Sequence, residues 1–385
     1  MSTSPSTSQE TNVDIEMERA RQTGAPGATT LPQPRRRVLD MPEYHPPLAN
    51  RSMLRLDFNE NTFSPSPKVI ERLRQTTAES LTIYPEREHV ERAVAAHFTL
   101  AAEQVLLTNG VDEAIHLLCA AFLEDGDEAL ISTPTFFMYD VSIGMMTSGL
   151  KRVQADASLE FPFDRFLSEV TPRTKLIMIA SPNNPTGAVV SRAHLLAICA
   201  AAPQAVVFVD EAYFHFHGET TIGDVGRVPN LVVGRTFSKA YGLANLRIGM
   251  LAGDARLLAY VRKVSSPYNV NGIALDVLPL ALADVDYLDW YIAEVHTGRE
   301  RLMLALDEMG VRYWPSHANF VLFEIGPRHK ELVSRMRDKG VLLRDRSADP
   351  GCDGYVRMTI GVEDHVTRGI EALRATLKEM QWTRP

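Results

Sequence analysis

Two residues that follow apolar runs have the chemistry of an imine-forming site. Lys239 comes soon after the run Leu231–Val233. A lysine at the base of an apolar pocket has a lowered pKa and can attack a carbonyl carbon to form an imine. Asp210 directly follows the run Ala205–Val209, so its carboxylate is expected at the end of a buried strand. There it needs a cationic partner, and a protonated pyridine nitrogen is one.

Neutral donors and an aromatic ring follow other apolar runs. Asn184 lies in the turn S-P-N-N-P-T-G at 181–187, whose prolines and asparagines predict an ordered loop. Asn184 and Tyr213 can both donate a hydrogen bond to a phenolic oxygen. The ring of Phe136 can stack on a planar ligand. Taken singly, each of these residues also fits a structural role in a turn or a core.

An anion site is expected where N-G-V-D-E at 109–113 ends one strand and opens a helix. Free backbone N–H groups and the helix dipole favour a phosphate there, and Arg247 can bind a phosphate in bidentate fashion. The stretch is neither a P-loop nor a G-x-G-x-x-G turn, so it indicates neither ATP nor a dinucleotide. A lysine, a carboxylate, two neutral donors, a ring and phosphate ligands together match the needs of pyridoxal 5'-phosphate.

Short apolar runs that alternate with amphipathic stretches must position these residues. Apolar residues on both faces of a run are typical of a parallel sheet covered by helices on both sides. The functional loops then meet at the carboxyl ends of the strands. The expected strands are Val105–Thr108, Ala129–Ser132, Leu150–Val153, Leu176–Ala180, Ala205–Val209, Leu231–Val233 and Arg247–Ala252, with helices such as Asp112–Leu123 and Arg192–Ala201 between them.

The pattern changes after residue 280 and predicts a smaller α+β unit. We expect four parts: a flexible tail at 1–45, a segment at 46–80 that joins the small domain, a large cofactor-binding domain at 81–285, and a small domain at 286–385. The small unit is expected to contain helices at Tyr287–Met309, Lys330–Lys339 and Glu363–Met380 and strands at Phe320–Glu324, Val341–Leu343 and Tyr355–Ile360.

The composition limits the classes of function. Hydrophobic residues make up 45% of the 385 residues and the net charge is -8, which argues against a general nucleic-acid binder. No apolar stretch approaches the roughly 18 residues of a membrane span. Three scattered cysteines and no visible signal peptide predict a cytoplasmic protein. His215 and His217 have only Glu211 and Glu219 nearby, and we expect no metal.

Four motifs in order resemble the class I and II, fold-type-I aminotransferases that use pyridoxal 5'-phosphate. The resemblance covers about residues 50–380 and implies a central, mostly parallel seven-stranded sheet plus a smaller α+β domain. The four motifs are S-P-N-N-P-T-G at 181–187, V-D-E-A-Y at 209–213, R-T-F-S-K at 235–239 and L-R-I-G at 246–249.

More narrowly, the chain resembles the histidinol-phosphate aminotransferase branch. L-D-F-N-E-N at 56–61, Y-P-E at 84–86, P-Y-N-V-N at 267–271, S-H-A-N-F-V-L-F at 316–323 and R-M-T-I-G at 357–361 carry this likeness. It implies transfer of an amino group from histidinol phosphate to a 2-oxo acid such as 2-oxoglutarate by ping-pong kinetics. It also implies a homodimer with shared sites.

The resemblance assigns a role to each site residue. Lys239 binds the cofactor covalently and moves a proton, Asp210 pairs with the pyridine nitrogen, and Asn184 and Tyr213 hold the phenolic oxygen. Phe136 stacks on the ring, and Tyr84 reaches the phosphate of the neighbouring subunit's cofactor. The remaining phosphate ligands are Val111, Asp112, Thr236, Ser238 and Arg247, and the substrate-binding residues are Asn59, Phe63, Asn319, Arg344 and Arg357.

Two departures from the branch concern the substrate. Ile83 stands where branch members often have Arg, and Phe63 stands where some have Tyr, so Phe63 cannot donate a hydrogen bond to a substrate phosphate. An aromatic amino-acid aminotransferase and a decarboxylase or other lyase on the same scaffold therefore stay open as alternatives. A regulatory domain joined to a DNA-binding helix-turn-helix is disfavoured, because the tail is short and the net charge is acidic.

Overall fold

The computed structural model describes residues 32–39, 41, 43 and 51–384. The chain divides into two compact units, Met1–Glu43 and Tyr44–Pro385. Helix α2 (Arg36–Leu39) belongs to the first unit, and every other described helix and strand belongs to the second. Most of the expected tail at 1–45 lies outside the described residues.

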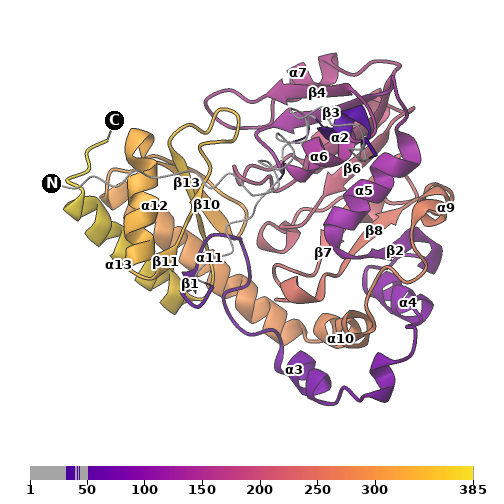
Figure 1. The fold of residues 1–385 in the computed structure, drawn as a ribbon, viewed down its shortest axis with the longest axis horizontal. Helices are drawn as coiled ribbons and strands as arrows, with labels where there is room; N and C mark the ends of the chain where they lie inside the picture. Colours follow the sequence, from indigo (N-terminus) through magenta and orange to yellow (C-terminus); the bar gives the residue numbers. More distant parts are fainter. Residues whose placement is uncertain (1–31, 40, 42, 44–50, 385) are drawn as a thin grey trace, which may run out of the picture. The chain divides into compact units, whose positions relative to one another are not determined.

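A seven-stranded sheet forms the larger part of the second unit as described (Figure 1). Only β8 runs antiparallel to its neighbours, so the sheet is mostly parallel, as the sequence predicts. In spatial order the strands are β2 (Val105–Thr108), β8 (Gly249–Gly253), β7 (Leu231–Thr236), β6 (Val206–Asp210), β5 (Thr174–Ala180), β3 (Glu128–Thr133) and β4 (Gly149–Gln154).

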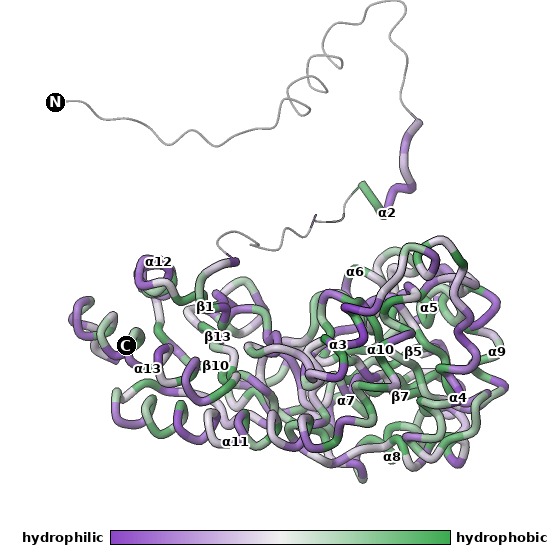
Figure 2. Tube along the Cα trace, turned by 90° about the horizontal axis from the view of Figure 1, so that it is seen from below, coloured by the Kyte–Doolittle hydropathy of each residue, from purple (hydrophilic) through white to green (hydrophobic). Residues whose placement is uncertain are grey.

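Both faces of this sheet are buried, because alternate residues of each strand enter different hydrophobic clusters. Leu107 and Val207 pack into one cluster, and Leu106 and Phe208 pack into the other. Apolar residues of α3 (Pro67–Arg74), α4 (Glu88–His97), α7 (Phe163–Ser168), α8 (Arg192–Ala201) and α10 (Gly272–Leu282) cover the first face, and those of α5 (Gly110–Phe122), α6 (Met138–Gly144) and α9 (Ala255–Val264) cover the second. Figure 2 shows apolar residues along β5 and β7, whereas α12 is largely hydrophilic.

An antiparallel sheet and three helices form the C-terminal part of the second unit. Strand β1 near the start of the described body pairs in parallel with β11, so residues far apart in sequence share this part. The elements are β1 (Leu54–Arg55), α11 (Val285–Glu308), β9 (Tyr313–Trp314), β10 (Phe320–Glu324), α12 (His329–Asp338), β11 (Val341–Leu342), β12 (Arg344–Asp345), β13 (Tyr355–Thr359) and α13 (Glu363–Glu379).

The predicted elements agree with the structure within a few residues, with one correction. Arg247 does not open a strand. It follows the 3₁₀ helix Ala244–Leu246 in the left-handed conformation with φ of 52°, and β8 begins at Gly249. The strand therefore begins two residues later than predicted, because a left-handed residue cannot continue an extended strand. The domain boundaries at 45, 80 and 285 stay a prediction.

The described residues contain neither a candidate membrane-spanning helix nor a candidate metal cluster. No helix there is long and apolar enough to cross a membrane. No group of three or more His, Cys, Asp or Glu side chains in this part of the chain is placed to hold a metal ion.

Gly234 of β7 provides a test of the packing between the sheet and α5. A Cβ at this position would lie 2.6 Å from ring atoms of Phe208. Overpacking of this kind typically costs about 1–3 kcal/mol, so Gly234→Ala is expected to lower the free energy of unfolding by that amount in urea titrations. Gly144→Ala is the matched control, because its Cβ meets nothing within 4 Å. Equal stability of the two variants would contradict the packing argument.

Candidate active site

Neighbouring strand ends bring the expected catalytic residues to one edge of the seven-stranded sheet. Asp210 is the last residue of β6 and lies in register with Ala180 of β5 and Gly234 of β7. Asn184 follows β5, and Lys239 follows β7. Since β5, β6 and β7 are parallel, their following loops must lie side by side.

The backbone of residues 57–59 links this edge to the C-terminal part. Lys239 Nζ donates a hydrogen bond to the carbonyl oxygen of Phe58 at 3.1 Å. Arg357 Nη2 donates to the carbonyl oxygen of Asp57 at 2.7 Å. Asn319 Nδ2 donates to the carbonyl oxygen of Asn59 at 3.2 Å. Three consecutive carbonyl groups thus hold a lysine, an arginine and an asparagine from distant parts of the chain.

The carboxylate of Asp210 is buried and held by two hydrogen bonds. Its Oδ2 accepts from the Tyr139 hydroxyl at 2.8 Å, and its Oδ1 accepts from the backbone N–H of Ala212 at 3.0 Å. Burial raises the pKa of Asp210 to about 6, although the bond from Tyr139 lowers it. Tyr139 is not among the site residues expected from the sequence, and its position three residues after Phe136 is the signal that could have found it.

Tyr213 is oriented toward a further acceptor by Asn59. Asn59 Nδ2 donates to the Tyr213 hydroxyl oxygen at 2.9 Å, so the hydroxyl proton of Tyr213 can be donated to another acceptor. Asn59 itself has φ of 55°, a conformation that is uncommon outside glycine. The Lys239 ammonium lies 5.9 Å from the centre of the Tyr213 ring, and the ring of Phe136 lies edge-on to Tyr139 at 5.7 Å.

The expected phosphate ligands gather around the start of α5. Arg247 Nη2 forms an ion pair with Asp112 Oδ2 at 2.8 Å. A Cβ on Gly110 would lie 2.7 Å from the same Arg247 nitrogen, so only glycine allows this approach. Ser238 N–H donates to Thr236 Oγ1 at 3.1 Å. The first turn of α5, which contains Val111 and Asp112, presents unpaired helical N–H groups of the type that bind phosphate.

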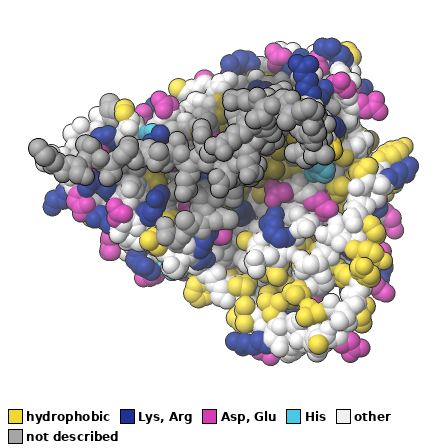
Figure 3. Space-filling view, in the orientation of Figure 1, with side chains coloured by type: hydrophobic (Ala, Val, Ile, Leu, Met, Phe, Trp, Pro, Cys, Tyr) yellow, Lys and Arg dark blue, Asp and Glu magenta, His cyan; other side chains and the backbone are white. Residues whose placement is uncertain are grey.

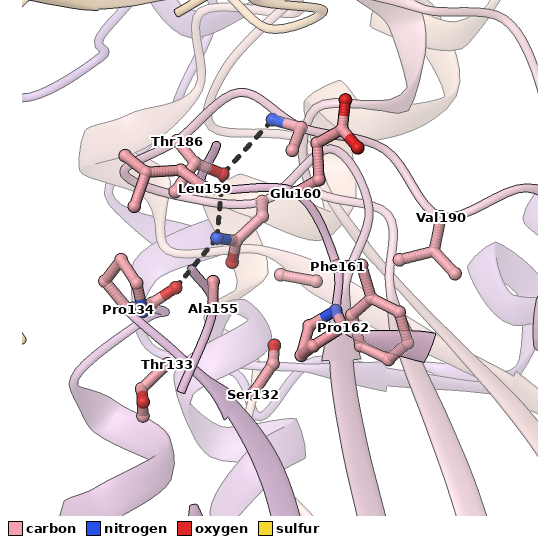
Figure 4. Close-up of a pocket in the computed structure, with 13 residues that line it drawn as sticks. Ser132, Thr133, Pro134, Ala155, Leu159, Glu160, Phe161, Pro162, Thr186 and Val190 are labelled. Atoms are coloured by element: carbon pink, nitrogen blue, oxygen red, sulfur yellow. Dashed lines mark hydrogen bonds between the residues drawn. The ribbon is translucent and has the colours of Figure 1, made fainter. Parts of the chain in front are cut away.

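Asn183 fixes the loop that carries Asn184. Its side chain accepts from Thr135 Oγ1 at 2.8 Å and donates to the carbonyl oxygen of Pro134 at 2.9 Å and to Thr186 Oγ1 at 3.0 Å. Figure 4 shows Pro134 and Thr186 at a small pocket that is also lined by the ends of β3 and β5, by Ala155 and by residues 159–162. With the loop held in this way, Asn184 Oδ1 accepts from Arg357 Nη1.

Arg357 and Arg344 lie directly opposite each other on β13 and β12. Arg357 is 4% exposed, and burial lowers its pKa to about 9, with Arg346 and Arg344 contributing. The Arg344 guanidinium lies 5.2 Å from the centre of the Phe58 ring. These two arginines therefore present positive charge beside the residues that contact Lys239, as an anionic substrate requires.

A buried ion pair joins the two motifs that carry Asp210 and Lys239. Arg235 Nη2 lies 2.7 Å from Glu211 Oε2, and both side chains are 2% exposed. Thr220 and Thr221 donate further hydrogen bonds to the Glu211 carboxylate. The Arg235 guanidinium lies 3.5 Å from the centre of the Phe214 ring. Arg235 is not among the site residues expected from the sequence, although a charged residue within an apolar strand is a signal of such a pair.

The structure does not bring Phe63 and Tyr84 into the group formed by the other site residues. Phe63 is 52% exposed, and its ring lies edge-on to Trp290 at 5.4 Å. Tyr84 is 74% exposed and stacks on Tyr268 at 4.4 Å. Their described ring contacts are with these two neighbours.

His215 and His217 do not form a common metal site within the described part of the chain. Burial lowers the pKa of His215 to about 3, with the charge of Arg235 as the next cause, so this imidazole is neutral. The ring of His217 lies 4.8 Å from that of His317.

Comparison with known proteins places these features in a family. Residues 51–373 match the model of the class I and II aminotransferases. The chain is 33% identical to a histidinol-phosphate aminotransferase of Caldanaerobacter subterraneus subsp. tengcongensis, over 84% of this chain and 93% of that protein. It is 34% identical to one of Methanocella arvoryzae, over 84% and 90%.

The fold is also that of a solved structure. The crystal structure of histidinol-phosphate aminotransferase from Sinorhizobium meliloti in complex with pyridoxal-5'-phosphate superimposes with a TM-score of 0.82, covering 91% of this chain and 99% of that one at 23% identity. This likeness confirms the expected fold class. The chain therefore belongs to the class I and II aminotransferases, in the branch of the histidinol-phosphate aminotransferases.

Proposed function

We propose that this protein transfers an amino group from histidinol phosphate to a 2-oxo acid such as 2-oxoglutarate, with pyridoxal 5'-phosphate as cofactor and ping-pong kinetics. One observation carries the proposal: Lys239 and Arg357 bind the adjacent carbonyl groups of Phe58 and Asp57. The amine that can hold a cofactor aldehyde therefore lies next to a buried arginine that can hold an anionic donor.

The residues present fit the proposed cofactor. The buried carboxylate of Asp210 has no positively charged partner among its described hydrogen bonds, and a protonated pyridine nitrogen would neutralise it. Asn184 and Tyr213 would hold the phenolic oxygen, and Phe136 would cover the ring. The close approach of Arg247 to Gly110 brings its guanidinium beside the start of α5, where it would bind the phosphate.

When bound, the cofactor supplies an electron sink for the bond that breaks at the Cα of the donor. Lys239 would move the proton away from Cα and return it to the cofactor, as general base and acid. Asp210 would keep the ring nitrogen protonated, and Tyr139 would hold the Asp210 carboxylate in place. Arg357 and Arg344 would orient the donor by its anionic group.

We further propose that the protein is a cytoplasmic homodimer in which Tyr84 reaches the partner's cofactor. Figure 3 shows hydrophobic side chains gathered over the region of α3, α4 and α10. Exposed apolar residues in the flanking segments include Leu81, Ile83, Tyr84, Tyr260 and Tyr268. Such a patch is typical of a protein interface. Cys119, Cys199 and Cys352 are buried and without disulfides, which fits a reducing compartment.

Histidinol phosphate is expected to convert the bound cofactor to its aminated form, and the loss of the cofactor's visible absorption measures this conversion. Phenylalanine at equal concentration is not expected to cause it. Lys239→Ala is expected to lower the transamination rate by about 10²–10⁴-fold or more, because the proton transfer loses its base. Stopped-flow absorption with each donor measures both effects.

Lys378→Ala is the control, because this lysine is exposed on α13 and its loss should leave the rate unchanged. Conversion by phenylalanine with histidinol phosphate inert would make the protein an aromatic aminotransferase. Near-normal turnover of Lys239→Ala would exclude the mechanism.

The raised pKa of Asp210 predicts a pH dependence of stability in the cofactor-free protein. The folded state holds the Asp210 proton up to about pH 6, whereas its ordinary pKa is 3.8. Protonated Asp210 therefore contributes to the free energy of unfolding below its ordinary pKa, and this contribution is lost as the pH rises to about 6. Unfolding midpoints from pH 4 to 8 should therefore fall for the wild type relative to Asp210→Asn. The same comparison of the wild type with Asp156→Asn should show no such fall, since hydrogen bonds from Ser158 lower the pKa of that exposed carboxyl.

Tyr84→Phe tests the shared site, because it keeps the ring but removes the hydroxyl. Loss of a hydrogen bond to a charged phosphate should weaken cofactor affinity by about 10- to 100-fold, while sedimentation shows an unchanged dimer. Tyr268→Phe is the matched control from the same stacked pair and should bind the cofactor normally. Equal affinities for the two variants would oppose the assignment of Tyr84.

A further inference from the structure

A third arginine lies on the same face as Arg344 and Arg357. Strands β12 and β13 pair Arg344 directly with Arg357. Arg346 comes two residues after Arg344, and its backbone N–H still bonds to the carbonyl oxygen of Tyr355. Because side chains alternate along extended chain, Arg344 and Arg346 share one face with Arg357. Three guanidinium groups therefore gather at the substrate end of the site.

One carboxylate of the same loop enters this group of positive charges. Asp349 Oδ2 forms an ion pair with Arg346 Nη2, and the two side chains are 20% and 12% exposed. Burial raises the pKa of Asp349, although Arg346, Arg357 and Arg344 all lower it. The other carboxylates nearby have partners of their own, since Asp57 pairs with Arg51 and Asp345 pairs with His329.

Two buried donors of the cluster lack partners in the described part of the chain. Arg346 Nε and Arg357 Nε are both buried, and their N–H groups find no hydrogen-bond acceptor there. A buried donor without an acceptor costs free energy. Arg357 is 4% exposed, so this cost is not relieved by solvent. Asp349 Oδ2, which forms the ion pair, also has no hydrogen-bond partner among the described residues, so the cluster has donor groups that Asp349 leaves unfilled.

We propose that Asp349 is an internal anion that occupies Arg346 in the free enzyme and is displaced by the distal anionic group of the substrate. The inference rests on the proposed function, because it concerns the substrate end of that site. It makes Arg346 and Asp349 determinants of specificity, with a phosphate monoester as the preferred distal group.

The selectivity follows from competition for the same guanidinium group. Asp349 is tethered three residues from Arg346, so a carboxylate of the substrate replaces an equal bond that is already present. A phosphate dianion carries more charge and three acceptor oxygens, so it can bond to two arginines at once. A neutral aromatic group cannot displace Asp349 at all. The apparent affinity of every anion equals its intrinsic affinity multiplied by the fraction of molecules in which the Arg346–Asp349 pair is open.

The test measures binding of inorganic phosphate to the holoenzyme by ³¹P NMR titration, without turnover. Asp349→Asn is expected to tighten phosphate binding by about five- to tenfold, because the internal competitor is lost. Arg346→Gln is expected to weaken it by at least about tenfold. The double variant should bind phosphate no more tightly than Arg346→Gln alone, since the effect of Asp349→Asn passes through Arg346.

Two controls separate competition from folding. Asp349→Glu keeps the charge and should bind phosphate within about twofold of the wild type. Glu331→Gln removes the carboxylate of another pair of the same spacing, Arg328 with Glu331, which lies on the surface, and should change nothing. Thermal unfolding of each variant identifies those that do not fold. Arg346→Gln leaves Asp349 without its ion-pair partner, and the double variant, which lacks both charges, is the control for that unpaired carboxylate.

Weaker or unchanged phosphate binding by folded Asp349→Asn would overturn the inference and make Asp349 a residue that only positions Arg346. A gain that persists in the double variant would also overturn it. Because no turnover is measured, the two proposals can fail separately. If histidinol phosphate is inert but the variants show the expected phosphate affinities, only the proposed donor is excluded. If transamination is normal but the variants do not show these affinities, only the role of Asp349 is excluded.

Discussion

The hydrogen bonds accepted by the backbone of residues 57–59 hold the whole site together. The carbonyl groups of Asp57, Phe58 and Asn59 receive Arg357, Lys239 and Asn319. None of these three side chains is near the others in sequence. Their relative positions therefore depend on one short segment that directly follows β1, and β1 is held by its pairing with β11. Any shift of this pairing would move the lysine and the arginine relative to each other.

Buried charge is the second constraint on the structure. Glu211 and Arg235 neutralise each other under the site, and the threonines at 220 and 221 complete the bonding of the carboxylate. Removing either partner would leave an uncompensated charge in the core. Asp210 differs, because its described partners are a hydroxyl and a backbone N–H. This incomplete compensation is what suits Asp210 to a cationic ligand rather than to a structural role.

Most elements could be predicted because their sequence patterns are local. The runs around Leu176–Ala180 and Phe320–Glu324 are apolar and bounded by turn residues, and both form strands as expected. Arg247 does not open a strand as the sequence predicts, because its backbone is left-handed, and its side chain pairs with the distant Asp112, a contact that no local pattern shows. The support of Asp210 by Tyr139 could not be predicted, because this hydrogen bond joins helix α6 to the end of β6, two elements far apart in sequence.

The sequence alone determined the family, the order of the strands along the chain and the identity of the groups that can do chemistry. Motifs such as S-P-N-N-P-T-G and R-T-F-S-K are contiguous, so residue type and spacing are enough to recognise them. Only the tertiary structure decided which of these groups meet and how each is charged. It placed Arg357 beside Lys239, buried Asp210 and added Arg346 with Asp349 to the arginine pair. Proximity and desolvation arise from packing between distant segments, and no local pattern encodes them.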